Sequence, residues 1–128
     1  MNVTNLRCEY RVNPLGIDVA RPRLSWQLAS NRRGARQTAY QIIAAASEEG
    51  ARQEHQLLWD SGKVASDQSI HVPYAGQPLS SGQRVWWKVR VWDERDQPAL
   101  ASDLAWWEMG LLKRDDWQAQ WIGASLVG

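Results

Sequence analysis

The chain has 128 residues, a length typical of one domain, and its 15 basic and 14 acidic residues leave a formal charge of +1. This balance lacks the basic surplus that nucleic-acid binding requires, so nucleic acid is excluded as a partner. No apolar run reaches the roughly 20 residues that span a bilayer, and the N-terminus lacks the apolar centre of a signal peptide, so we expect a soluble chain with no membrane partner and favour a cytoplasmic location.

Cysteine and histidine are too few and too scattered for a disulfide framework or a metal site. Cys8 is the single cysteine, and neither His55 nor His71 has another Cys or His at a metal-binding spacing. We therefore expect no metal and no cofactor. The unusual feature is nine tryptophans without a phenylalanine. Trp suits a sandwich core, an interface or a sugar-stacking platform, so its abundance alone leaves all three open.

The first third of the chain predicts two strands separated by a turn. Residues 3–11 alternate loosely, with Leu6, Cys8 and Tyr10 on one side, as in an edge strand. The sequence NPLG at residues 13–16 is a turn signal, because Pro fixes φ and Gly tolerates positive φ. Residues 23–29 alternate again, and we expect Trp26 to be buried.

The next segment carries conflicting local signals. Residues 37–58 are rich in Ala, Glu, Gln and Leu, which favour helix. The β-branched pair Ile42 and Ile43, together with the short strands expected on both sides, favours a strand over residues 37–47. We predict this strand, with Tyr40, Ile42 and Ala44 inward, followed by a mobile loop at residues 48–56 with at most one helical turn.

The strongest strand signal is RVWWKVRVWDE at residues 84–94. Its period of two predicts a central strand with Trp87, Val89 and Val91 in the core. Shorter strands are expected at residues 57–61 and 69–73, and a hairpin partner at 104–109 with Trp107 inward. Seven short strands punctuated by Pro and Gly predict an all-β, antiparallel β-sandwich. The outward positions form an aromatic and cationic candidate surface for another domain or a ligand: Trp86, Lys88, Arg90, Trp92 and Trp106.

The last residues lack the alternation of the preceding strands. Residues 1–112 are expected to form the sandwich, and residues 113–128 a linker and the truncated start of a following domain. Trp117 and Trp121, without that neighbour, are expected to be disordered or to be buried by self-association with another copy.

Candidate catalytic groups were sought among the acidic pairs, because glycosidic hydrolysis uses two carboxyl groups on opposite sides of the scissile bond. The pairs are Glu48 with Glu49, Asp93 with Glu94, and Asp115 with Asp116. All fall in expected loops or linker, where neighbouring side chains point apart and are solvated. No nucleophile elbow, phosphate loop or zinc motif occurs. We therefore assign no catalytic residue to this chain.

A set of motifs in one order resembles the N-terminal region of bacterial α-L-rhamnosidases. They are NPLGIDVARPRLSWQL at 13–28, QTAYQI at 37–42, WDSGKV at 59–64, residues 79–93, EMGLL at 108–112 and WQAQWIG at 117–123. The resemblance implies a fibronectin type III or immunoglobulin-like sandwich at the head of a large glycoside hydrolase, whose catalytic acids lie in a distant (α/α) barrel that hydrolyses terminal α-L-rhamnosides with inversion. It also implies that WQAQWIG enters the next domain. One departure is Val85, which stands where such folds often place the tyrosine of a tyrosine corner.

Three functions follow as alternatives. The first is a non-catalytic accessory domain that packs against the other domains of a rhamnosidase through the outward Trp face. The second is a carbohydrate-binding module that stacks sugars on those rings, and the third is a free-standing adhesion or receptor module. Because Lys and Arg side chains can also cover aromatic rings within one domain, the outward face does not by itself require a partner.

Overall fold

The computed structural model describes residues 2–30, 34–99 and 101–111. In this part of the chain the elements are β1 (Asn2–Cys8), β2 (Arg23–Ala29), β3 (Ala39–Ala45), α1 (Glu48–Gln53), β4 (Leu57–Asp60), β5 (Val72–Pro73), β6 (Arg84–Trp92) and β7 (Ala105–Glu108). The prediction of seven strands is confirmed, although several are shorter than expected. No helix in the described ranges is long and apolar enough to cross a membrane.

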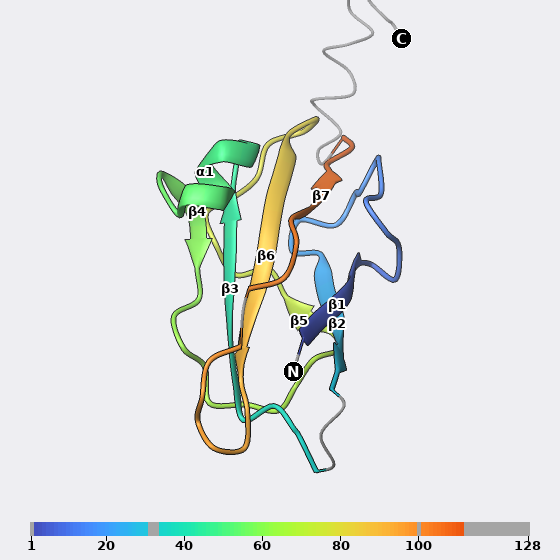
Figure 1. The fold of residues 1–128 in the computed structure, drawn as a ribbon. Coiled ribbons are helices and arrows are strands. Elements are labelled where there is room, and N and C mark those ends of the chain that lie inside the picture. The colour runs from blue at the N-terminus through green and yellow to red at the C-terminus, as the bar shows by residue number, and fades with distance from the viewer. Residues whose placement is uncertain (1, 31–33, 100, 112–128) are drawn as a thin grey trace, which may run out of the picture.

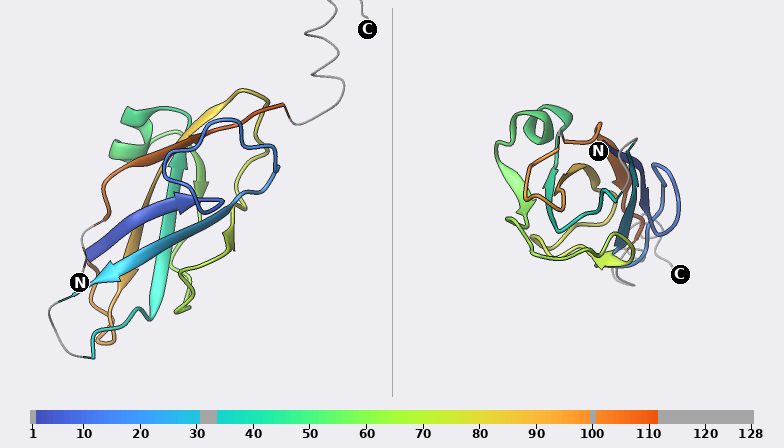
Figure 2. Two further views of the ribbon diagram at one scale, coloured as in Figure 1. Left: turned by 90° about the vertical axis from the view of Figure 1, so that its right-hand side faces the viewer. Right: turned by 60° about the horizontal axis from the view of Figure 1, so that its bottom comes forward.

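The strands form two antiparallel sheets that face each other (Figures 1 and 2). The smaller sheet has the order β1-β2-β5, and the larger has the order β4-β3-β6-β7. In the larger sheet β6 pairs with β3 along seven residues, from Ala39 opposite Trp92 to Ala45 opposite Trp86. The predicted antiparallel β-sandwich is therefore confirmed, with β6 at its centre.

The core lies between the sheets and is dominated by alternate residues of β6. Val85, Trp87, Val89 and Val91 are all buried, so Val85 contributes to packing where a tyrosine corner would otherwise stand. The other sequence-predicted core positions, Trp26, Tyr40, Ile42 and Trp107, are buried as well. Aromatic rings in this core meet edge to face. The ring centroids of Trp26 and Tyr40 are 5.3 Å apart, and those of Trp87 and Trp107 are 6.1 Å apart.

A buried glutamine organises one end of this core. The indole nitrogen of Trp26 donates to Gln37 Oε1 at 3.0 Å, and Gln37 Nε2 donates to the carbonyls of Ser66 and Gln68. The amide thus satisfies a buried ring nitrogen and fixes the loop before β5.

The first strand differs from the prediction in which residues face inward. Val3, Leu6 and Cys8 are buried, but Tyr10 is exposed. Asn5 has a φ of 52° and the pairing with β2 shifts register between Thr4 and Arg7, so a bulge breaks the simple alternation. Glu9 and Tyr10 also have positive φ, and the strand ends at Cys8 before Tyr10 can point into the core.

The segment after β3, expected to be a mobile loop with room for one helical turn, contains the six-residue helix α1. Ser47 is its N-cap and accepts a hydrogen bond from the Gly50 amide at 2.9 Å, with Glu48 and Glu49 in the first turn. Gly50 lies so close to β3 that an added Cβ would be 3.4 Å from the Cβ of Ala45. The helix therefore packs directly on the outer side of the larger sheet.

The connection between β1 and β2 is tied to the end of β7. Ile17 N donates to Glu108 O at 3.0 Å, Glu108 N to Pro14 O at 3.0 Å, and Gly110 N to Ile17 O at 2.7 Å. Asn13 Oδ1 accepts from the Trp106 amide at 3.0 Å. Gly110 suits this close approach, because a Cβ there would lie 3.1 Å from the backbone of Gly16, closer than most Cβ contacts. This loop consequently lies beside β7 (Figure 1).

Candidate interaction surface

The outer side of the larger sheet carries the aromatic and cationic residues that were predicted as an interaction surface. Trp86 on β6 lies opposite Trp106 on β7, and their ring centroids are 6.4 Å apart at 54°. The guanidinium of Arg84 lies 4.0 Å from the centroid of the Trp106 ring and pairs with Glu108 at 3.2 Å. Both rings are half-buried, so part of the expected aromatic face is already occupied by a cross-strand pair and a cation-π contact.

Trp92 lies at the other end of β6, away from this pair. The ammonium of Lys63 lies 4.9 Å from its ring centroid and also pairs with Asp96 at 2.6 Å. Trp92 is likewise half-buried. The structure therefore separates Trp92 from Trp86 and Trp106 along the strand, and the three rings do not form one continuous platform.

Lys88 and Arg90 lie between these rings, but they are engaged with α1. Lys88 points away from the core, as alternation predicts, but it is only 9 % exposed. Its ammonium lies 3.0 Å from Glu54 Oε2 and 3.3 Å from the carbonyl oxygen of Arg52. The reason is α1, which covers this part of the outer face; Ile43, opposite Lys88 on β3, is buried by the same helix.

Arg90 extends this contact into a polar ladder across the sheet. Its guanidinium donates to Glu54 at 3.0 Å and to Gln41 Oε1 at 3.0 Å. Gln41 Nε2 in turn donates to Asp60 Oδ1 at 2.8 Å on β4. The ladder therefore connects three strands to the C-terminal end of the helix.

Glu54 is the centre of this arrangement. It is the C-cap of α1, with a left-handed φ of 57° that turns its side chain back over β6. The hydrogen bond from Lys88 holds the pKa of the Glu54 carboxyl below its ordinary value of 4.5, and Arg90 adds to this effect against partial burial, which raises it. Glu54 thus remains a carboxylate that neutralises two cations.

The arrangement favours packing over chemistry. Asp93 accepts hydrogen bonds from the backbone amides of Arg95 and Gln97, so its carboxylate shapes the turn after β6. Glu48 forms an ion pair with Arg52 on the exposed side of α1. Among the described residues no three His, Cys, Asp or Glu side chains are close enough to hold a metal ion. The pair Asp115 and Asp116, and the tryptophans Trp117 and Trp121, lie outside the described residues.

Sequence reasoning missed a second surface, on the connection between β1 and β2. Val12, Leu15 and Val19 are exposed there, next to the turn signal at residues 13–16. Apolar residues that flank a Pro and Gly turn were the available signal, because a turn on the surface presents its neighbours to solvent.

Comparisons with known proteins agree with this fold. The family model described as "Rha78A-like, N-terminal immunoglobulin domain" matches residues 3–113. An α-L-rhamnosidase of Streptomyces avermitilis is 48 % identical over 124 residues, which are 97 % of this chain and 12 % of that protein. One from Alteromonas sp. is 44 % identical over 114 residues, 88 % of this chain and 12 % of that protein. The chain thus spans about an eighth of the length of these curated relatives.

Solved structures show the same similarity. The S. avermitilis α-L-rhamnosidase complexed with L-rhamnose superposes with a TM-score of 0.86 at 47 % identity, over 91 % of this chain and 11 % of that one. The α-L-rhamnosidase from "Dictyoglumus thermophilum" gives a TM-score of 0.88 at 36 % identity, over 92 % and 13 % of the two chains. The resemblance inferred from the motifs is confirmed, and the chain belongs to the family of Rha78A-like N-terminal immunoglobulin domains.

Proposed function

We propose that this chain is a non-catalytic N-terminal accessory domain of an α-L-rhamnosidase, a glycoside hydrolase acting on terminal α-L-rhamnosides, and that it supports packing between domains. The main support for this proposal is how much of each protein aligns. Nearly the whole chain aligns with these rhamnosidases, yet it accounts for only 12 % of their length. A domain of this size and position in a larger enzyme contributes most simply through contact with its neighbours.

The proposed partners are the remaining domains of the same enzyme. We place the sandwich at residues 1–112 and the linker with the start of the next domain at 113–128, which is supported by a family match that ends at residue 113. In the isolated chain, Trp117 and Trp121 would lack that neighbour and promote association between copies. Sedimentation at several concentrations, compared with a chain ending at residue 112, measures this self-association.

The outer face of the larger sheet is one proposed contact site. Trp86, Trp92 and Trp106 keep part of their rings exposed, whereas Lys88 and Arg90 would act from beneath by holding α1 in place. Replacing Trp86 and Trp92 with Ser in the intact enzyme should lower its thermal stability. Unchanged stability and activity would show that this face does not serve as a docking surface.

Hydrolysis assays test whether catalysis lies outside this chain. The 128-residue chain should not hydrolyse an aryl α-L-rhamnoside, and titration with L-rhamnose should leave its tryptophan fluorescence unchanged. The full-length enzyme should hydrolyse the same substrate. Turnover by the chain alone would refute the non-catalytic assignment, and a saturable fluorescence change would favour a carbohydrate-binding module. A gene that ends soon after codon 128 would favour a free-standing module instead.

A further inference from the structure

The most exposed apolar side chains in the described residues concentrate in one loop. Large hydrophobic residues with high exposure are Tyr10, Val12, Leu15, Val19 and Ile70. The first four lie within the connection between β1 and β2. We define the exit-side patch as Val12, Leu15 and Val19, which are 61 %, 60 % and 42 % exposed. Because a soluble domain gains by burying such groups, a cluster of them on one loop is typical of an interaction site.

Backbone hydrogen bonds between the loop and the end of β7 hold this patch in place. Pro14 and Ile17 exchange backbone hydrogen bonds with Glu108 and Gly110 at 2.7 to 3.0 Å. The loop therefore continues the edge of the larger sheet beyond β7 (Figures 1 and 2). A surface that is already ordered loses little conformational freedom when a partner covers it.

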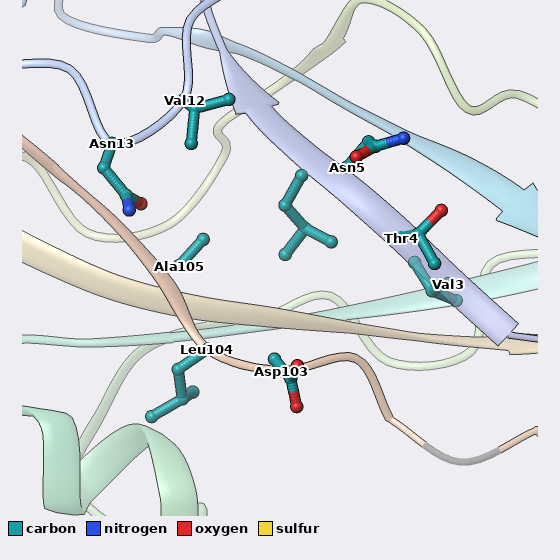
Figure 3. A pocket seen from close by; sticks show the side chains of 9 residues that line it. Val3, Thr4, Asn5, Val12, Asn13, Asp103, Leu104 and Ala105 are labelled. Atoms are coloured by element: carbon teal, nitrogen blue, oxygen red, sulfur yellow. The ribbon is translucent and has the colours of Figure 1, made fainter.

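Two cavities are lined in part by residues of this loop. One, of about 300 Å³, separates β1 from the start of β7; Figure 3 shows Val12 and Asn13 on one side of it and Asp103, Leu104 and Ala105 on the other. A second, of about 370 Å³, is lined by Gly16, Ile17 and Val19 together with the charged residues Glu9, Arg11 and Asp18. Leu15 is 60 % exposed, and its neighbours in the sequence line these recesses, Asn13 the first and Gly16 the second, so the loop offers a partner an exposed apolar group together with recesses.

The position of the patch indicates its occupant. The described part of the chain ends at Leu111, one residue after Gly110, whose amide donates to the Ile17 carbonyl. Whatever domain follows is tethered beside the patch, and tethering raises its effective concentration there far above that of a free partner. From Val12 to Val19 Asp18 is the single charged residue, so the complementary surface should be mainly apolar.

We propose that the exit-side patch is the docking surface for the domain that follows in the same chain, and that this domain covers Leu15 and Val12 with apolar side chains. This inference rests on the proposed function, because it requires a longer enzyme. It assigns the principal domain contact to the loop between β1 and β2, at a site distinct from the Trp face of the larger sheet.

Hydroxyl-radical footprinting read by mass spectrometry tests the proposal. The side-chain oxidation rates of Val12 and Leu15 are compared between the 128-residue chain and the full-length enzyme. We expect both rates to fall several-fold in the full-length enzyme. Ile70 is the matched control, because it is an aliphatic side chain of similar exposure, 56 %, before β5 and outside the patch, and its rate should be unchanged. Equal Leu15 rates in the two proteins would overturn the proposal.

A substitution in the full-length enzyme gives an independent reading. Leu15→Ser should lower the midpoint of thermal inactivation by several degrees and leave kcat at low temperature unchanged, whereas Ile70→Ser should leave both unchanged. Equal midpoints for the two variants would overturn the proposal. Protection of Leu15 in the 128-residue chain that grows with concentration would also overturn it, since the occupant would then be a second copy.

Failure of this inference can be told from failure of the proposed function. A full-length protein that hydrolyses α-L-rhamnosides but leaves Leu15 as reactive as in the short chain contradicts only the docking surface. A full-length protein without that activity contradicts the proposed function itself, whatever the footprint shows.

Discussion

The substitution Glu54→Gln tests how α1 is attached to the larger sheet. One carboxylate oxygen of Glu54 lies 3.0 Å from the Lys88 ammonium and 3.0 Å from the Arg90 guanidinium. Gln has the same shape and can still accept a hydrogen bond, but it carries no charge. The side chain of Lys88, 11 % exposed, would then be a largely buried cation whose remaining neighbour is the Arg52 carbonyl at 3.3 Å.

The magnitude follows from the burial of this site. Hydrogen bonds to charged groups contribute about 1.5 to 3 kcal/mol, whereas exposed ion pairs contribute about 0 to 1 kcal/mol. Glu54 is about one-third exposed and Lys88 is nearly buried, so an intermediate loss of about 1 to 2 kcal/mol in unfolding free energy is expected. For a domain of this size such a loss lowers Tm by about 4 to 7 °C.

Urea unfolding followed by tryptophan fluorescence measures this loss, with Glu48→Gln as the matched control. Glu48 makes the same kind of ion pair with Arg52 at 3.0 Å, but both side chains are more than half exposed. Its loss should change the unfolding free energy by no more than about 0.5 kcal/mol. If Glu54→Gln and Glu48→Gln lower stability equally, the role assigned to Glu54 is refuted.

The pH dependence of the Glu54→Gln effect has a defined sign. Because the folded state lowers the pKa of Glu54, the carboxylate contributes stability above its ordinary pKa of 4.5, and this contribution is lost as pH falls through the lower, folded value. The difference in unfolding free energy between wild type and Glu54→Gln should therefore be constant from pH 6 to 8 and shrink under acid. A difference that grows below pH 4.5 would contradict this sign.

Three further predictions concern the core. Trp87→Ala should lower the unfolding free energy by about 3 to 5 kcal/mol, because Trp87 is fully buried. Trp86→Ala, on the opposite face of the sheet, should lower it by about 1 kcal/mol or less. Denaturant unfolding measures both losses, and equal losses would contradict the assigned faces. Burial, with a smaller contribution from the charge of Glu9, raises the pKa of the Cys8 thiol to about 12. A thiol reagent at pH 8 should therefore label Cys8 only as urea unfolds the domain. Rapid labelling of the native protein would contradict the burial of Cys8. Gly76→Ala should destabilise the domain by about 1 to 3 kcal/mol, because the new Cβ would lie 2.4 Å from the Cβ of Trp59. An unchanged Tm would show that this contact relaxes.

The period-two pattern of β6 was sufficient to predict which of its residues form the core. Trp87, Val89 and Val91 follow from local alternation, because one face of a central strand must be apolar. The same rule was misleading for Tyr10, since a bulge at Asn5 and positive φ at Glu9 interrupt the strand. Alternation predicts a face only while the backbone remains regular.

The candidate surface was less predictable, because it depends on contacts between distant residues. Alternation placed Lys88 outward, and it does point away from the core; the helix α1, 36 residues earlier at Arg52, then buries it. Ser47 and the two following glutamates were a readable helix start. What they could not predict is that Glu54 adopts a left-handed φ and reaches Lys88 and Arg90 on another strand.

We propose that this domain stabilises an α-L-rhamnosidase without taking part in its chemistry. Heat inactivation of aryl α-L-rhamnoside hydrolysis tests it most directly, measured on the full-length enzyme and on the same enzyme lacking residues 1–111. We expect equal kcat for the two proteins at low temperature and a lower inactivation midpoint for the shortened one. A folded, shortened enzyme that has lost turnover, or one with an unchanged midpoint, would contradict it.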